Sequence, residues 1–352
     1  MYHFIVFAFS CLLVYFFTFF VKKIAIKLNF IDRPEERKFH KTPTPLLGGI
    51  AILIGMIVTF LISILAGNPI MPDFNRGLFF FFLGAILISG LGIIDDIFGM
   101  SPYLKFAIQT AIALTFMFGT GVTTILGAWY ISVPIFLLWM VGLMNAMNFL
   151  DNMDGITAGM GAILSLGYCA LGILSSNHYL SFLSALFMGC SLGFLFHNFH
   201  PAKIFLGDAG SMLVGYSLSA FGIMLLPELP NNFTRLLPVL MLSYAIFDIS
   251  LVSFTRHRDG RYVFQGGKDH TTHRIDTAMG SVKVTAFMVY FLNILLVLIS
   301  VIVFNINNQY LTLISTIIFA GLFFFFGEKL DNVPILITQN QLKHKESHSS
   351  KF

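Results

Sequence analysis

The sequence predicts an all-α polytopic membrane protein with about 11 transmembrane helices, because its composition and its hydropathy pattern both lead to this class. Of its 352 residues, 57% are hydrophobic and only 11% are charged, and the mean hydropathy is +0.83. These values exclude a soluble globular domain. A helix that crosses a bilayer needs about 20 mostly apolar residues. The chain contains eleven such runs.

The predicted spans follow one another with short polar connections. They cover residues 3–21, 46–66, 77–94, 104–120, 133–150, 155–175, 178–197, 209–226, 236–255, 282–304 and 310–327. The first run is expected to be retained as a span, because no basic segment precedes it and no small-residue cleavage pattern follows it. The connection at 121–132 is interpreted as a small hairpin or a plain loop. We expect residues 1–327 to form one membrane domain and residues 328–352 to form a polar cytoplasmic C-terminal tail.

The distribution of charge indicates the orientation of the chain. An odd number of spans places the termini on opposite sides, and Lys and Arg mark the cytoplasmic side. If the spans alternate as predicted, 19 of the 21 basic residues share one side, and only Arg76 and Arg235 fall opposite. This predicts a multi-pass protein of the inner (plasma) membrane with its N-terminus outside and its C-terminus in the cytoplasm. Among the acidic residues only Asp73 and Glu228 map outside, so we expect the active site in cytoplasmic loops.

Glycines begin the second predicted span. Gly48 and Gly49 follow the mixed-charge segment IDRPEERKFHKTPTPLL. Because small residues let helix backbones approach closely, we expect this span to pack tightly against another. The charges before it are interpreted as orientation signals, with substrate contact as the alternative.

Adjacent carboxylates end the third predicted span. Asp95 and Asp96 lie in LGIIDDIFGMSPYLKF, and Lys105 opens the fourth span. Two neighbouring carboxylates repel each other unless a cation or a proton lies between them, and a nearby lysine suits a phosphate group. The alternative is a solvated helix end with a turn at Gly99 and Pro102. We favour a functional role because acidic residues near a span are costly.

A second polar segment follows the fifth predicted span. In NAMNFLDNMDGITAG, Asn148, Asp151 and Asp154 recur at intervals of three. On a continued helical turn these side chains would share one face and converge. A polar loop with helix-capping residues is the alternative.

A third acidic site precedes the eighth predicted span. In FLGDAGSMLVGY, Asp208 lies between Gly207 and Gly210. A small-residue turn that leads into a helix exposes backbone N–H groups to a phosphate, while the carboxylate can hold a magnesium ion against it. Asp is also an ordinary N-cap residue, so the motif by itself leaves the structural interpretation open.

A basic segment follows the ninth predicted span and contains enough donors to bind a diphosphate. Its members are Arg256, His257, Arg258, Arg261, Lys268, His270, His273 and Arg274. Orientation of the chain explains some of these positive charges without a ligand, but it does not explain the two histidines near a Gly-Gly turn. Asp248 lies about 12 Å before Arg256 along a helix. It is predicted to be buried, and we favour a structural pairing over a catalytic role.

The ordered motifs together resemble the polyprenyl-phosphate N-acetylhexosamine-1-phosphate transferase family (glycosyltransferase family 4), which includes WecA, TagO and the MraY translocases. The resemblance runs from about Asp32 to Asp276 through DRPEERKFHKTPTPLLGG, DDIFG, NFLDNMDGITAG, FLGDAGS and the Arg/His segment. It implies an Mg-dependent phosphoglycosyltransferase. Such an enzyme transfers a hexosamine-1-phosphate from a UDP-sugar to undecaprenyl phosphate and releases UMP, as the first membrane step of a cell-envelope polysaccharide.

The resemblance also implies roles for individual residues. Asp95 and Asp96 match the paired catalytic aspartates, and Lys105 matches a phosphate-binding lysine. Asp208 matches the principal Mg²⁺ ligand, with Mn²⁺ as the alternative ion, and Asn148 is expected to join it. The expected substrate-binding residues are Lys105, Asp151, Asp154, His270, His273 and Arg274. The chain departs from the pattern at DHTTHRI, where WecA-like members usually have His-x-His-His.

Other functions remain open at this stage. The family includes the MraY role in peptidoglycan synthesis, which the changed histidine motif makes less expected. A cation-coupled transporter would place its acidic residues at the bilayer midplane, often in inverted repeats, whereas here they gather at one face. A noncatalytic scaffold would have no use for converging carboxylates. The expected partners are the UDP-sugar, the polyprenyl phosphate and the lipid bilayer, with no nucleic acid and with a homodimer as one option.

Overall fold

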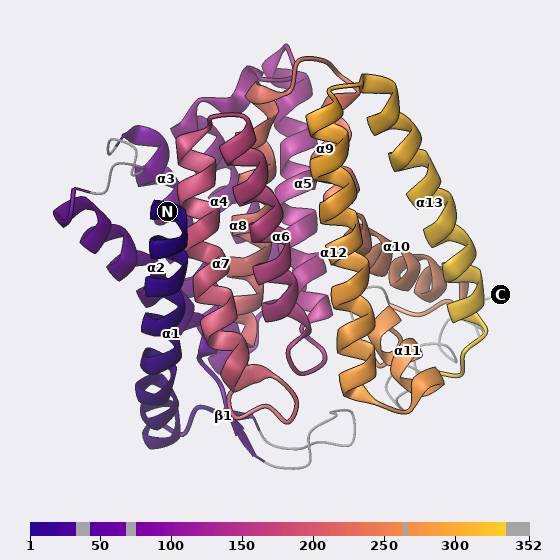
Figure 1. Cartoon of the computed structure of the whole chain (residues 1–352). Coiled ribbons are helices and arrows are strands. Elements are labelled where there is room, and N and C mark those ends of the chain that lie inside the picture. Colours follow the sequence, from indigo (N-terminus) through magenta and orange to yellow (C-terminus); the bar gives the residue numbers. More distant parts are fainter. Residues whose placement is uncertain (33–42, 68–74, 263–266, 336–352) are drawn as a thin grey trace.

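The computed structural model describes residues 1–32, 43–67, 75–262 and 267–335, and these residues are mostly helical (Figure 1). The α-helices are α1 (Tyr2–Lys27), α2 (Gly48–Leu65), α3 (Arg76–Phe98), α4 (Pro102–Thr120), α5 (Trp129–Leu150), α6 (Ile156–Leu174), α7 (His178–Asn198), α8 (Gly207–Leu225), α9 (Leu237–Met241), α10 (Ser243–Arg258), α11 (Thr271–Met279), α12 (Val282–Ile306) and α13 (Gln309–Asp331). Short 3₁₀ helices are η1 (Val122–Thr124), η2 (Leu226–Glu228) and η3 (Thr234–Leu236). Strands β1 (Ile31–Asp32) and β2 (Thr44–Pro45) pair antiparallel, with Ile31 opposite Pro45.

The prediction of an all-α membrane protein is confirmed. Within the described part of the chain, nine helices are long and apolar enough to cross a bilayer, namely α1, α2, α3, α5, α6, α7, α8 with η2, α12 and α13. The fourth predicted span forms α4, a 19-residue helix that is not among them. The 121–132 connection is a loop that contains η1 rather than strands.

The ninth predicted span, 236–255, is not one straight helix. It forms α9 and α10, which bend by 65° at Leu242, and only as a bent pair do they reach the length and hydropathy of a span. The polar side chains Ser243, Asp248 and Thr255 interrupt the apolar pattern of α10. The bend lets α10 lie across the other helices in Figure 1, next to α11 and the lower end of α13.

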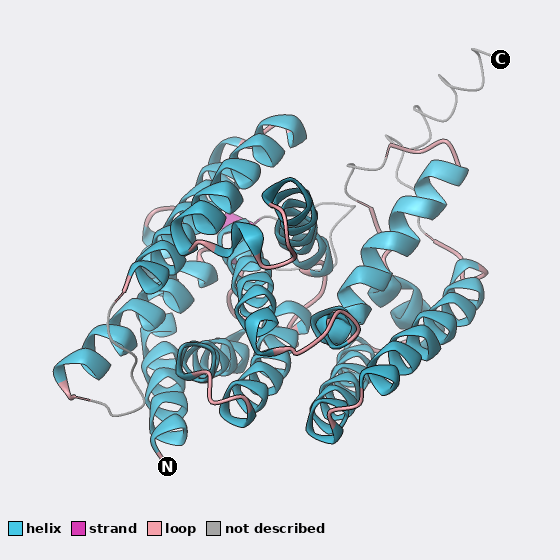
Figure 2. Cartoon of the chain, turned by 90° about the horizontal axis from the view of Figure 1, so that it is seen from above, coloured by secondary structure: helices cyan, strands magenta, loops and turns pink. Residues whose placement is uncertain are grey.

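Helix α8 lies at the centre of the bundle. In its spanning window 94% of residues are buried, compared with 28% for α1 and 17% for α13. Figure 2 shows the described residues from above, and almost all of them lie in helices. Gly49 at the start of α2 packs so closely on Gly210 of α8 that a Cβ atom at Gly49 would overlap the Gly210 backbone. The predicted close approach through this glycine is therefore confirmed.

The helices alternate in direction and gather polar side chains at one end of the bundle. The C-terminal ends of α3 and α5 meet the N-terminal ends of α4 and α8 there. Thr272 of α11 joins them by a hydrogen bond to Asn152, just after α5. Asp331, the last residue of α13, bonds Arg274 of α11. We call this region the polar end.

Candidate active site

The centre of the polar end is the ammonium group of Lys105. Its Nζ atom lies 2.6 Å from Asp95 Oδ2, 2.5 Å from Asp208 Oδ2 and 3.3 Å from Asn148 Oδ1. An ammonium group has three N–H donors, so each donor has one oxygen acceptor. Four helices, α3, α4, α5 and α8, therefore place four predicted site residues in direct contact.

Local sequence explains why Asp95 and Lys105 lie together. Helix α3 ends at Gly99, whose φ of +65° lies in the region that glycine adopts without strain. Ser101 then caps α4 by accepting a hydrogen bond from Leu104 N, and Pro102 occupies the first turn, where no backbone donor is needed. This short connection puts the last turn of α3 beside the first turn of α4.

Asp96 supports the start of α8. Both of its carboxylate oxygens accept from Asp208 N, each at 3.1 Å. Gly207 makes this approach possible, because its φ is +71° and a Cβ atom there would lie 2.7 Å from Asp96 Oδ2. The turn before α8 was predicted to offer backbone N–H groups to a phosphate. At Asp208 that donor is instead bonded to Asp96, which fixes the direction of the Asp208 side chain.

Asn148 holds Asp208 from the other side. Its Nδ2 atom donates to Asp208 Oδ1 and to Ser211 Oγ, both at 2.9 Å. Ser211 lies one turn after Asp208 on α8, so this pair of contacts locks α5 against α8. The side chain of Asp208 remains 31% exposed, which leaves its carboxylate accessible to a ligand.

The predicted common face of Asn148, Asp151 and Asp154 does not form, because α5 ends at Leu150 and a turn follows. Asp154 Oδ2 instead accepts from His200 Nδ1 at 2.8 Å and from Ala202 N at 3.0 Å. Asp154 therefore ties the turn after α5 to the connection between α7 and α8.

Asp151 remains near the carboxylates of the polar end. Burial raises its pKa to about 8, and the negative charges of Asp208, Asp96 and Asp154 act in the same direction. A carboxyl group in this position favours a proton or a cation nearby.

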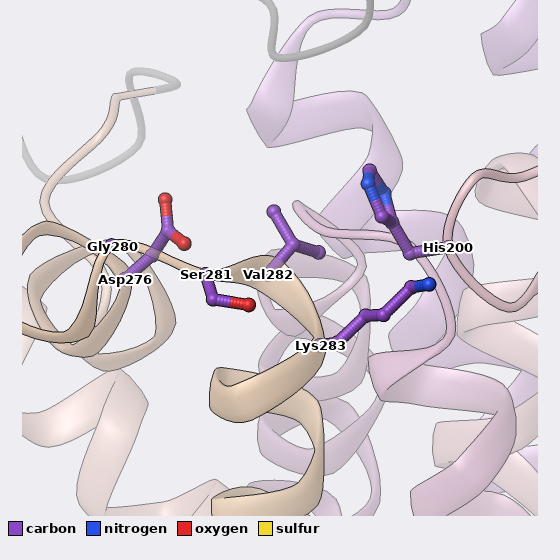
Figure 3. Close-up of a pocket in the computed structure, with 6 residues that line it drawn as sticks. All are labelled: His200, Asp276, Gly280, Ser281, Val282 and Lys283. Atoms are coloured by element: carbon purple, nitrogen blue, oxygen red, sulfur yellow. The ribbon is translucent and has the colours of Figure 1, made fainter.

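A polar pocket lies beside His200 (Figure 3). Its volume is about 490 Å³, and it is lined by His200, Asp276, Gly280, Ser281, Val282 and Lys283. Burial raises the pKa of Asp276, while the nearby His200 acts in the opposite direction. None of the residues around Lys105 lines this pocket, so it is separate from the carboxylate cluster.

Several arginines of the basic segment form hydrogen bonds and ion pairs with other residues of the chain. Arg256 Nε and Nη2 bind the two oxygens of Asp269 at 2.9 and 2.7 Å, and Arg261 Nη1 binds the same carboxylate at 2.6 Å. Burial alone would raise the pKa of Asp269, but its bonds with Arg256 hold it below the ordinary value. Arg274 is buried and donates to the carbonyl oxygens of Asp269 and Leu330, both at 2.9 Å. Its substrate-binding role stays a prediction that this geometry does not favour.

The histidines lie at the start of α11. His270 Nδ1 is 2.9 Å from Asp248 Oδ2, and the same carboxylate accepts from Thr271 N at 2.8 Å and Thr271 Oγ1 at 2.6 Å. The rings of His270 and His273 lie 6.3 Å apart. Burial and the neighbouring His270 lower the pKa of His273 to about 3, so this side chain is neutral at pH 7. Asp248 is buried and paired as predicted, with His270 and Thr271 as its partners.

Thr272 stands where the resembling family usually has a histidine, and Thr271 occupies the variable position before it. Thr271 binds Asp248, and Thr272 Oγ1 donates to Asn152 Oδ1 at 2.7 Å. The two threonines thus anchor the first turn of α11 to α10 on one side and to the turn after α5 on the other. This anchoring brings His270 beside Phe149, with their ring centroids 5.7 Å apart.

Sequence reasoning found most of the cluster but missed three supporting residues. Ser211 and Asn152 could have been suspected, because each lies three or four residues from a predicted site residue. His200 gave no signal, since its bond with Asp154 joins segments 46 residues apart. Residues 33–42, which include most of the DRPEERKFHK motif, lie outside the described residues.

The donor set suits a hard divalent cation. Asp95 and Asp208 bind the ammonium of Lys105, and the carboxylates of Asp96 and Asp151 lie near that of Asp208. Among the residues that the structure describes, no three His, Cys, Asp or Glu side chains are close enough together to hold a metal ion by themselves. Mg²⁺ commonly binds through one or two carboxylates together with substrate phosphates and water, so the residues present fit this ion when a phosphate completes the site.

Comparison with known proteins identifies the family. The model of glycosyl transferase family 4 matches residues 78–226. The probable undecaprenyl-phosphate N-acetylglucosaminyl 1-phosphate transferase of Bacillus subtilis (strain 168) is 33% identical over 297 residues, which cover 81% of this chain and 80% of the relative. The decaprenyl-phosphate N-acetylglucosaminephosphotransferase of Mycobacterium tuberculosis (strain CDC 1551 / Oshkosh) is 34% identical, covering 76% of this chain and 74% of the relative.

A more distant match is the phospho-N-acetylmuramoyl-pentapeptide-transferase of Caldicellulosiruptor bescii. It is 32% identical over 220 residues, which cover 57% of this chain and 67% of the relative. The matched region of the family model contains Asp95, Lys105, Asn148 and Asp208, the four residues that meet at the polar end. The resemblance inferred from the motifs is confirmed, and the chain belongs to glycosyl transferase family 4.

Proposed function

We propose that this chain transfers an N-acetylhexosamine-1-phosphate from a UDP-sugar to undecaprenyl phosphate and releases UMP. The first relatives carry names of this activity with undecaprenyl or decaprenyl phosphate as acceptor. In the reaction, an oxygen of the lipid phosphate attacks the β-phosphorus of the UDP-sugar. The bond from that phosphorus to the bridging oxygen breaks, and UMP leaves with the electron pair.

The observation that carries this proposal is the contact of Lys105 with Asp95, Asp208 and Asn148 at the ends of four helices. Phosphoryl transfer needs positioning and charge stabilisation more than covalent chemistry from the protein. A fixed ammonium among carboxylates and at the interface end of apolar spans suits both. At this position the Lys105 ammonium can bind both the lipid phosphate, which reaches it from the bilayer, and the charged UDP-sugar, which reaches it from water.

We propose different tasks for the carboxylates, and their contacts support this division. Lys105 neutralises phosphate charge as it develops at the leaving group. Asp95 holds the Lys105 ammonium and accepts from Met100 N at 2.7 Å, so it orients the lysine. Asp96 fixes Asp208, the second residue of α8, and acts through it. The acceptor is a phosphate monoester whose second pKa is about 6, so little proton remains to be removed at pH 7.

We further propose Mg²⁺ as the cofactor, with Mn²⁺ as a substitute. Asp208 and the amide oxygen of Asn148 would hold it together with oxygens of the donor diphosphate. When bound, the ion would withdraw negative charge from the diphosphate and from the leaving UMP. Asp208 remains partly exposed, which leaves room for such a ligand.

The polar end is proposed to face the cytoplasm. If the spans alternate as the sequence predicts, most basic residues of the chain share the side of Lys105, and positive charge marks the cytoplasmic side of a span. UDP-sugars are water-soluble, so this orientation gives them access to Lys105. The product, a lipid-linked sugar diphosphate, would start a cell-envelope polysaccharide.

The test is UMP release by the purified protein in detergent with undecaprenyl phosphate, Mg²⁺ and a panel of UDP-sugars. Release that needs both lipid and donor, and that falls at least 100-fold in Asp208→Asn, supports the proposal. The matched control is Glu228→Gln at the opposite end of the same span, which should keep its rate within twofold. No release with any UDP-sugar, from protein that melts cooperatively, would contradict the proposed reaction.

A further inference from the structure

The carboxylate of Asp248 is a fully buried charge near α11 whose hydrogen bonds all go to the first residue of that helix and to its N-cap. It is 0% exposed and accepts three hydrogen bonds, from His270 Nδ1, Thr271 N and Thr271 Oγ1, at 2.6 to 2.9 Å. Burying a carboxylate costs several kcal/mol unless it is well paired. Three short hydrogen bonds offset that cost, and they also fix the carboxylate in one orientation.

The fold brings Asp248 to this place through the bend at Leu242. Asp248 lies on α10, 22 residues before His270, and the 65° turn between α9 and α10 directs this part of α10 towards α11. Helix α11 has no side-chain cap from its own N-cap residue, His270. Asp248 supplies that cap from another helix by accepting from Thr271 N. A negative charge also suits a helix N-terminus.

The contact with His270 has a consequence beyond the cap. Because Nδ1 faces a carboxylate, it carries a proton, and Nε2 is the ring nitrogen left to meet a ligand. A carboxylate in this position sets both the tautomer and the ring orientation of a histidine. His270 lies beside Phe149, the residue next to Asn148 in α5, so its ring borders the turn that links the polar end with α11.

We propose that Asp248 is a positioning residue for the transferase: it holds His270 so that Nε2 faces the diphosphate of the UDP-sugar. This inference rests on the proposed function. It extends that function to a residue on α10 whose carboxylate bonds His270 and Thr271 rather than Lys105, Asp95 or Asp208. Thr272, bonded to Asn152, holds the other side of the same turn.

A substitution to Asn separates positioning from packing. Asp248→Asn keeps the size of the side chain and can still accept from Thr271 N. Its amide donor, however, faces Nδ1, which favours the opposite tautomer with the proton on Nε2. In a serine-protease triad, the same change of a histidine-bound Asp to Asn leaves the geometry intact and lowers the rate by about 10⁴. Partners that orient metal-bound histidines contribute about 10- to 100-fold, which is the range expected here.

The experiment is a double-mutant cycle in the UMP-release assay with the full-length protein. Asp248→Asn and His270→Gln should each lower kcat/KM for the UDP-sugar about 10- to 100-fold, and the double variant should be no slower than His270→Gln alone. KM for undecaprenyl phosphate should stay within threefold. Ser250→Ala, on the exposed side of the same helix, should match the wild type.

Independent, multiplying losses in the double variant would overturn the proposal, because Asp248 would then act other than through His270. A wild-type rate in Asp248→Asn would overturn it as well. If Asp248→Asn does not fold, Asp248→Glu keeps the charge but moves the carboxylate by one methylene group. It should melt near the wild-type temperature and still lose at least tenfold in kcat/KM, whereas a purely structural role predicts full activity. Absence of UMP release by the wild type would instead count against the proposed function.

Discussion

Replacing Lys105 by Gln removes the one ammonium that contacts both Asp95 and Asp208. The wild-type contacts are 2.6 and 2.5 Å long, and the side chains involved are 11% to 31% exposed. Removal of a fixed donor that stabilises transition-state charge typically lowers kcat by about 10² to 10³, or ~2.7 to 4 kcal/mol. Because Asp208 is partly exposed and water screens part of its charge, we expect the lower end, about 100-fold.

The assay is steady-state UMP release at saturating UDP-sugar and lipid, together with a thermal melt of each variant. Lys105→Gln should lower kcat about 100-fold. It should also lower the melting temperature, since two carboxylates lose their ion pair. Lys23→Gln, at an exposed position near the end of α1, removes the same charge and should change kcat less than twofold. A Lys105→Gln enzyme that keeps more than a third of wild-type kcat would refute the central role of this ammonium.

Three further predictions follow from the same region. Gly207→Ala should destabilise the protein by about 1–3 kcal/mol and reduce UMP release, because its φ is +71° and the new Cβ would press on Asp96. The control Gly121→Ala, with φ +78° and open space around it, should show the backbone strain without the loss of activity. Equal activity in the two variants would contradict the packing argument. The raised pKa of Asp151, about 8, means that the folded state binds this proton more tightly than the unfolded chain. Wild-type stability should therefore fall as pH rises from about 4 to about 8. In thermal melts across this range, Asp151→Asn should show a smaller fall in melting temperature with pH. Equal falls in the variant and the wild type would show that Asp151 does not titrate as described. Chelation of divalent ions should abolish UMP release and added Mg²⁺ should restore it, with Mn²⁺ restoring part; a rate that is unchanged after exhaustive chelation would exclude the proposed cofactor.

Much of the fold could be predicted because each span is marked by its own apolar residues. A run of about 20 such residues forms a helix in a bilayer whatever its neighbours are. The residues around Lys105 could also be predicted as a group, since Asp95, Asn148 and Asp208 all lie at the ends of spans that return to one side. Their placement on one side of the bilayer follows from that alternation.

The remaining features depend on contacts between distant segments. The apolar content of 236–255 predicts a span, but the local pattern does not contain the 65° bend at Leu242 or the contact of Asp248 with His270 of α11. The arginines near the histidines were interpreted as diphosphate donors. Arg256 and Arg261 are instead bonded to Asp269, eight to thirteen residues away, and sequence alone does not distinguish an arginine that binds a ligand from one that binds its own chain.

The histidine motif of the family was most informative where this chain departs from it. Thr272 stands where the family usually has a histidine, and Thr271 occupies the variable position before it; each has a partner, Asp248 for Thr271 and Asn152 for Thr272. Neither partner could be assigned from spacing, because they lie 23 and 120 residues away. The structure therefore adds the supporting contacts of the site, whereas the sequence indicated its charged centre.

The most direct test of the proposed reaction follows the β-phosphate of the donor. The purified protein would receive undecaprenyl phosphate and a UDP-sugar, chosen by the UMP-release panel, that carries one label in the sugar and another in the β-phosphate. Transfer of a sugar-1-phosphate predicts that both labels enter the lipid in equal amounts and that UMP is released unlabelled. If the sugar label enters the lipid while the β-phosphate label leaves as UDP, the chain is a sugar transferase of a different kind, and the role given to the Lys105 site is wrong.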